Sequence, residues 1–192
     1  MIAQPNFLDV AGKQLAWRGR EGEGPGVVFL GGFASDMLGT KAEFLDDWCA
    51  DRSRAYLRLD YSGHGESSGE FIDGCIGEWA ADAIAAVDQL TKGPQIIVGS
   101  SMGGWIGLLL ARALPDRVAG FVGIAAAPDF TEDLMWADFD QSIRDQIIND
   151  GVYWEPSEYS DEPTPITRKL IEDGRDQLVL RSPLQINGPV RL

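Results

Sequence analysis

Ser101 lies in a sequence pattern that could make its hydroxyl a nucleophile. It is the central residue of the run G-S-S-M-G at residues 99–103. The apolar residues 95–98 precede this run, and residues 105–114, rich in leucine and alanine, follow it. We therefore expect a strand, a tight turn and a helix, the arrangement of a nucleophile elbow, in which a strained serine stands on the turn. Glycine is needed two positions before and after the serine because such a turn leaves no room for side chains there.

Acyl transfer to a serine also needs N–H groups that stabilise the carbonyl oxygen of the substrate, which becomes negative during the reaction. The helix after Ser101 would supply one from Met102, since free N–H groups point out of a helix N-terminus. A second would come from Phe33, which follows two glycines and the apolar run 27–30. The sequence therefore predicts Ser101 as the catalytic residue and Phe33 and Met102 as the oxyanion hole. The alternative is that each is part of an ordinary glycine-rich turn.

The elements that would position these residues alternate along the chain through about residue 128. We expect strands at 27–30, 54–60, 95–98 and 118–124, and helices at 37–52, about 79–90 and 105–114. This alternation predicts an α/β fold with a mostly parallel sheet and helices on both faces. Residues 7–10 and 14–17, separated by an Ala-Gly pair, predict an antiparallel hairpin at the edge of the sheet.

Residues 129–176 differ in composition from the rest of the chain. They contain fourteen Asp and Glu against four Lys and Arg, so a net charge of −10 out of the chain's −14 lies there. Apolar spacing predicts an amphipathic helix between Met135 and Ile148, and a shorter one between Ile166 and Ile171. The segment could be a helical pair with solvated acidic faces.

We interpret residues 129–186 instead as a helical cap inserted after a core of residues 1–128. The segment leaves the sheet after a strand's carboxyl end, where open parallel sheets bind their ligands. Trp136 is then a candidate substrate-binding residue.

Composition limits the partners of the chain. A net charge of −14 over 192 residues argues against nucleic acid or an anionic membrane as a partner, and favours a small-molecule substrate. No apolar run is long enough for a membrane span, and the first residues lack the pattern of a signal peptide. We expect a soluble, cytoplasmic protein in which Cys49 and Cys75 are reduced thiols. We expect no cofactor and no metal.

Four sequence blocks, taken together, resemble the α/β-hydrolase superfamily. They are residues 29–37, 60–67, 98–105 and 125–130. Within the superfamily, the chain is similar to small bacterial serine carboxylesterases related to the mitochondrial acyl-protein thioesterase and acyl-glucuronide esterase group. The resemblance implies that Ser101 is the nucleophile, that Phe33 and Met102 supply the oxyanion N–H groups, and that substrates are carboxylic esters or thioesters. Gly31 stands where many members have histidine.

The position of the histidine in the chain departs from the superfamily pattern. In the family the triad follows the order nucleophile, acid, histidine. The one histidine here, His64, precedes Ser101 and lies in a D-x-x-G-H-G turn at residues 60–65, which is a structural loop in the family. Asp129 is a candidate for a displaced acid, although it more simply begins the cap.

Residues 187–192 resemble the start of the family's next core strand, whose loop would carry the catalytic Asp. We therefore expect a hydrolase truncated at its C-terminus, with its last strands missing. Strand 118–124 would be an open sheet edge through which the chain could self-associate.

Two function classes remain open. In the first, the protein is a serine esterase or thioesterase that forms an acyl-enzyme on Ser101 and is inactive as the 192-residue chain. In the second, it is a non-catalytic α/β-hydrolase-like protein that binds an acyl ligand or a protein. A histidine encoded further downstream would favour the first.

Overall fold

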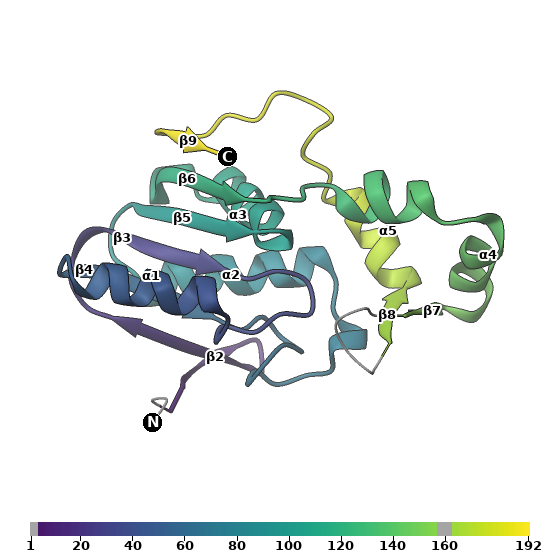
Figure 1. The fold of residues 1–192 in the computed structure, drawn as a ribbon, viewed down its shortest axis with the longest axis horizontal. Coiled ribbons are helices and arrows are strands. Elements are labelled where there is room, and N and C mark those ends of the chain that lie inside the picture. Colours follow the sequence, from purple (N-terminus) through teal and green to yellow (C-terminus); the bar gives the residue numbers. More distant parts are fainter. Residues whose placement is uncertain (1–3, 157–162) are drawn as a thin grey trace.

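The computed structural model describes residues 4–156 and 163–192, and its centre is a twisted β-sheet (Figure 1). Seven strands form this sheet within the described part of the chain, in the order β1-β2-β4-β3-β5-β6-β9. Their bounds are β1 Asn6–Val10, β2 Lys13–Arg20, β3 Glu23–Leu30, β4 Arg54–Leu59, β5 Gln95–Ser100, β6 Val118–Ile124 and β9 Val190–Arg191. Strands β1 and β2 form an antiparallel hairpin at the edge, and β4, β3, β5, β6 and β9 run parallel. The predicted mostly parallel sheet with an edge hairpin is confirmed.

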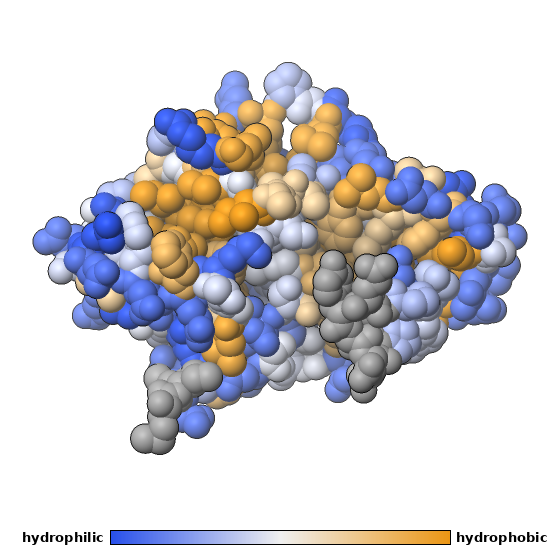
Figure 2. Space-filling model, in the orientation of Figure 1, coloured by the Kyte–Doolittle hydropathy of each residue, from blue (hydrophilic) through white to orange (hydrophobic). Residues whose placement is uncertain are grey.

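Helices cover both faces of this sheet, as expected (Figure 1). Helices α2 (Ile76–Leu90) and α3 (Met102–Ala113) pack on one face, and α1 (Thr40–Ala50) packs on the other. The larger apolar core lies on the α2 and α3 side, where Trp79, Trp105 and Phe121 are almost completely buried. Helix α1 covers its face only in part, and apolar surface remains visible over β5 and β6 (Figure 2).

The central position of β3 brings two loops together. It pairs with β4 on one side and β5 on the other, and its last residue, Leu30, is opposite Gly99. Because the strands are parallel, the loop after β3 and the turn after β5 leave the same edge of the sheet. Phe33 and Ser101 therefore lie in neighbouring loops.

The chain after β6 builds a separate group of elements beyond the carboxyl ends of the strands (Figure 1). They are the π-helix η3 (Thr131–Trp136), α4 (Gln141–Asp150), β7 (Val152–Glu155), β8 (Thr164–Thr167) and α5 (Arg168–Asp176). Strands β7 and β8 form an antiparallel pair that the apolar pattern did not predict.

The predicted single helix between Met135 and Ile148 is wrong. The π-helix ends at Trp136, and α4 begins only at Gln141. The break lies at Asp140, whose carboxylate caps α4 by accepting a hydrogen bond from the N–H of Ile143 at 3.0 Å.

The predicted helix between Ile166 and Ile171 is also too long at its start. Ile166 lies in β8, and Thr167 caps α5 by accepting a hydrogen bond from Leu170 N at 3.0 Å.

The expectation of an open edge at β6 is wrong as well. Val190 and Arg191 pair with β6 in parallel, and Phe121 N donates to Pro189 O at 3.0 Å. The chain can approach β6 because Gly188, at φ +93°, has no side chain, and a methyl group there would overlap the carbonyl oxygen of Ala119. Strand β9 therefore forms this edge of the described sheet, and self-association through it remains a prediction. No helix among the described residues combines the length and apolarity that crossing a membrane requires.

Candidate active site

Ser101 stands on a strained turn between β5 and α3. Its backbone has φ 52° and ψ −121°, which is unfavourable for a residue with a side chain. Three backbone hydrogen bonds hold this conformation: Ser101 N donates to Ile124 O at 3.0 Å, and Ser101 O accepts from Gly104 N at 2.9 Å and from Ala127 N at 3.1 Å. The residue is exposed, and its hydroxyl does not cap the helix. The strained strand-to-helix turn that the sequence predicts is therefore present around an accessible hydroxyl.

The glycines of the turn are required by close backbone contacts. A methyl group at Gly99 would overlap the carbonyl of Gly103, and a methyl group at Gly103 would overlap the carbonyl of Leu30. Helix α3 can therefore begin directly against β5 and β3, which places its N-terminus at the edge of the sheet where Ser101 lies.

The residues predicted for the oxyanion hole lie on either side of Ser101. Met102 is the first residue of α3, where backbone N–H groups have no partner within the helix. On the other side, a methyl group at Gly32 would be only 3.4 Å from Cβ of Ser101, so the loop that carries Phe33 lies against the serine. The structure thus brings Ser101, Met102 and the Phe33 loop together. Their catalytic roles remain a prediction.

The Phe33 side chain is held by three aromatic rings. Its ring centroid lies 5.0 Å from that of Phe71, 5.9 Å from Trp79 and 5.7 Å from Phe130, all edge to face. The ring of Phe130 also lies 5.7 Å from that of Trp105 in α3. Edge-to-face pairs are favourable and directional, so these contacts fix the Phe33 loop relative to α3. Sequence reasoning missed Phe71 and Phe130, which are distant from Phe33 along the chain.

His64 is buried in the same aromatic cluster. The residue is 3% exposed, and its ring lies 5.0 Å from those of Phe71 and Trp79. Nδ1 is 3.3 Å from Ser62 O, and Nε2 has no hydrogen-bond partner among the described residues. Burial lowers the pKa of the imidazole to about 4, so His64 is neutral near pH 7. The hydrogen bond that the structure describes for this ring goes to the backbone and not to Ser101, as expected for a structural histidine.

The turn that carries His64 is built around Asp60. One carboxylate oxygen accepts Met37 N at 2.6 Å, and the other accepts Glu66 N at 2.9 Å. Gly65 packs so closely that a methyl group there would overlap this carboxylate. Burial raises the pKa of Asp60, and the two backbone N–H groups oppose that rise. Asp60 therefore shapes the loop.

Asp129 does not act as a displaced triad acid in this structure. The residue is completely buried, and its two carboxylate oxygens accept Val179 N at 2.8 Å and Leu180 N at 2.9 Å. Arg181 Nη1 lies 3.6 Å away. Both oxygens therefore join the start and the end of residues 129–180, the segment after β6 that we call the excursion.

Trp136 lies on the excursion, where two arginines cover its ring. The guanidinium carbons of Arg144 and Arg175 lie 5.4 Å and 4.7 Å from the ring centroid. Arg144 also donates two hydrogen bonds to Trp136 O. These cation–π contacts hold the indole within the excursion. A role for Trp136 in substrate binding remains a prediction.

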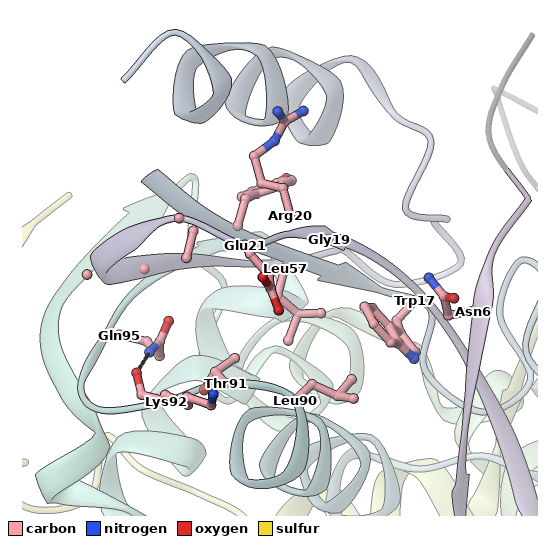
Figure 3. A pocket seen from close by; sticks show the side chains of 15 residues that line it. Asn6, Trp17, Gly19, Arg20, Glu21, Leu57, Leu90, Thr91, Lys92 and Gln95 are labelled. Carbon is pink, nitrogen blue, oxygen red and sulfur yellow. Dashed lines mark hydrogen bonds between the residues drawn. The ribbon is translucent and has the colours of Figure 1, made fainter. Parts of the chain in front are cut away.

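A large hollow lies at the other end of the sheet (Figure 3). It has a volume of about 530 Å³ and is lined by Trp17, Leu57, Leu90 and Gln95, among others. Gln95 is the first residue of β5, whereas Ser101 follows the last. This hollow is therefore separate from the candidate active site.

The chain matches known proteins across most of its length. The model of the alpha/beta hydrolase fold family matches residues 25–168. The mitochondrial palmitoyl-protein thioesterase ABHD10 of Bos taurus is 37% identical over 195 residues, covering 100% of this chain and 61% of its own length. The human protein of that name is 36% identical over 182 residues, covering 93% of this chain and 58% of its own length. The chain thus spans about three fifths of the length of these curated relatives.

Solved structures agree with this match. The alpha/beta hydrolase domain-containing protein 10 from mouse superimposes with a TM-score of 0.88 at 33% identity, covering 98% of this chain and 76% of that chain. The crystal structure of a protein from Agrobacterium vitis S4 superimposes on this chain with a TM-score of 0.91 at 39% identity, covering 97% of this chain and 76% of that chain. The chain therefore belongs to the alpha/beta hydrolase fold family.

Proposed function

We propose that this chain forms the nucleophile-bearing part of a serine hydrolase that cleaves carboxylic esters or thioesters. The observation that carries the proposal is the strained, exposed Ser101 between the N-terminus of α3 and the Phe33 loop. The names of the bovine and human relatives, palmitoyl-protein thioesterases, support a thioester substrate.

In the proposed reaction, the Ser101 hydroxyl loses its proton to a base and its oxygen attacks the carbonyl carbon of the substrate. The N–H groups of Met102 and Phe33 donate hydrogen bonds to the carbonyl oxygen as it becomes negative. Collapse of this intermediate releases the alcohol or thiol, which takes up the proton, and leaves an acyl-enzyme. Water then releases the carboxylic acid and restores Ser101.

His64 is not placed to act as the base that takes the proton from Ser101. His64 is buried among aromatic rings and is the single histidine of the 192 residues. We therefore propose that the 192-residue chain alone turns over esters slowly, and that efficient catalysis needs a base from outside these residues. The same observation favours a second candidate, an acyl-ligand binder that performs no turnover.

The excursion after β6 is proposed to cap the site. Phe130, at its root, contacts both Phe33 and Trp105, so the excursion begins beside the proposed oxyanion hole. An acyl chain bound at Ser101 would then lie between the sheet edge and the residues after 129.

The test compares ester and thioester hydrolysis by the native full-length protein and its Ser101→Ala variant. Hydrolysis of p-nitrophenyl esters and an S-acyl thioester should fall by a factor of about 10³ or more in Ser101→Ala. Ser100→Ala, which changes the neighbouring serine, is the control and should retain activity. Turnover that survives in Ser101→Ala would refute the proposal, whereas saturable acyl binding without turnover would favour the binder.

A further inference from the structure

Three arginines line a second hollow, on the α1 face of the sheet. The hollow has a volume of about 350 Å³, and Arg18 and Arg20 of β2 and Arg58 of β4 all contribute to its wall. Its acidic lining residues are Glu43 and Asp46 of α1. Three guanidinium groups and two carboxylates therefore line this hollow, in a chain of net charge −14. We propose that this hollow binds a small oxyanion, the phosphate or carboxylate group of a small molecule.

The strand register forces the arginines together. Arg18 and Arg58 are directly opposite in the antiparallel pair of β2 and β4, so their side chains leave the same face of the sheet at one position. Arg20, two residues further along β2, points to the same face. Like charges at opposite positions repel, so this arrangement requires negative charge nearby.

Water solvates these guanidinium groups poorly. Arg18 is 8% exposed and Arg58 is 7% exposed. A buried charge is costly unless it is paired and hydrogen-bonded. Arg18 is paired with Glu66, whereas Nε of Arg58 has no hydrogen-bond partner among the described residues, so an anion in the hollow would relieve the cost at Arg58.

The carboxylates of the chain supply part of the negative charge. Asp46 is shared, because Arg20 Nε donates to its Oδ1 at 2.7 Å while Arg58 Nη2 lies 3.4 Å from its Oδ2. Glu66 lies 2.6 Å from Arg18 Nη1, but its side chain is 42% exposed and it is not among the residues that line the hollow. Within the lining, one aspartate therefore serves two guanidinium groups.

Arg58 retains an unused donor. Its Nη1 donates to Met37 O at 2.9 Å, whereas its Nε is buried and has no hydrogen-bond partner among the described residues. A guanidinium presents its donors in a planar fork that matches phosphate and carboxylate oxygens. Gln4 and Asn6 also line this hollow.

The proposed anion site and the larger hollow open on opposite faces of β2, and Asn6, Gly19 and Arg20 contribute to the walls of both. Figure 3 shows Trp17 and Leu57 beside the larger hollow, while the Arg20 side chain points away from it, toward the helix above. The ion pair of Arg20 with Asp46 of α1 agrees with this direction. The site is therefore defined by one face of β2 and by α1.

The test is calorimetric titration of the 192-residue chain with inorganic phosphate at constant ionic strength, set with NaCl. We expect saturable binding of one phosphate per chain. Arg20→Gln should weaken the affinity at least about tenfold, because a charge-assisted partner is lost. Arg112→Gln removes an exposed arginine of α3 outside the hollow and should leave the affinity unchanged.

Two further measurements test where the anion binds and whether the site prefers phosphate or carboxylate. Arg58→Lys keeps the charge but removes the planar fork, and should also weaken binding, with circular dichroism confirming that the variant is folded. Titration with succinate in place of phosphate distinguishes a carboxylate site from a phosphate site. Absence of saturable heat with both anions, or equal affinities in Arg20→Gln and Arg112→Gln, would overturn the proposal. The second result would place the anion elsewhere, for example at the N–H groups beside Ser101.

Discussion

The carboxylate of Asp129 binds the backbone N–H of Val179, fifty residues later in the chain, at 2.8 Å. Its second oxygen binds the next N–H, that of Leu180, at 2.9 Å. Nearby, Trp105 of α3 donates its indole N–H to Gln177 O at 3.1 Å. One buried carboxylate and one indole therefore fix both ends of the excursion beside the helix that begins at Ser101.

Asp129→Asn should lower the free energy of unfolding by about 2–4 kcal/mol. Asparagine keeps the shape and tolerates the left-handed backbone, φ 58° at this residue, but its NH₂ group would face a backbone N–H that needs an acceptor. Urea denaturation measures the loss. Asp133→Asn removes an exposed carboxylate that pairs with Arg181 and should have little effect. Equal stabilities of the two variants would show that the buried carboxylate does not hold the excursion.

Gly103→Ala should be severely destabilising, by about 3 kcal/mol or more, because its methyl group would overlap the carbonyl oxygen of Leu30 in β3. A backbone atom in a central strand cannot move aside cheaply. Gly31→Ala is the matched control, since a methyl group there has no atom within 4 Å. Thermal and urea unfolding should rank Gly31→Ala close to the parent chain and Gly103→Ala far below it. The reverse ranking would contradict the geometry of the turn.

Ser101→Gly should be more stable than Ser101→Ala by about 1 kcal/mol. Both variants remove the hydroxyl, but only glycine relieves the strain at φ 52° and ψ −121°. That relief exceeds the added flexibility of glycine in the unfolded chain. Chemical denaturation of the two variants measures the difference directly. If alanine is equally stable or more stable, the backbone at Ser101 is not strained.

His64 should make the protein less stable as the pH falls from about 6.5 to 4. Its pKa in the folded state is lowered to about 4, below the ordinary value of 6.5, so the unfolded state binds the proton more readily in this window. The stabilisation is complete above pH 6.5 and is lost through the window, up to about 3 kcal/mol.

The measurement compares pH-dependent urea unfolding of the parent chain and His64→Asn. Burial raises the pKa values of Asp60 and Asp82, which gives a pH dependence of the opposite sign, but this contribution is present in both proteins and cancels in the difference. Because His64 is the single histidine, the difference reports this residue. Parallel stability profiles from pH 7 to pH 4 would argue against a neutral, buried imidazole.

The core of the fold was predictable because its signals are local. Each parallel strand is a short apolar run, and each helix between the strands repeats apolar residues on one face. The turn at Ser101 was predictable for the same reason, since the glycine spacing, the preceding strand and the following helix all lie within about twenty residues.

The excursion was predicted less well because its contacts are distant or its signals are weak. The pairing of β7 with β8 joins short strands whose apolar residues also fit a helical spacing, as Ile166 shows. The bonds of Asp129 to Val179 and Leu180 link residues that no spacing rule connects. The burial of His64 against Phe71 and Trp79 was likewise visible only in three dimensions, although the turn motif already suggested a structural role.

The closure at Asp129 has a consequence for how this fold can vary. The first and last residues of the excursion meet at Asp129, and between them α5 also binds helix α2, where the carboxylate of Asp173 accepts Gly77 N at 2.7 Å and Lys169 pairs with Glu78 at 2.7 Å. A segment that replaced residues 131–177 would therefore have to keep both attachments, the closure at Asp129 and the contact of α5 with α2, for the core to retain its neighbours. Between these two attachments the excursion can vary in sequence and length while the sheet that carries Ser101 is preserved.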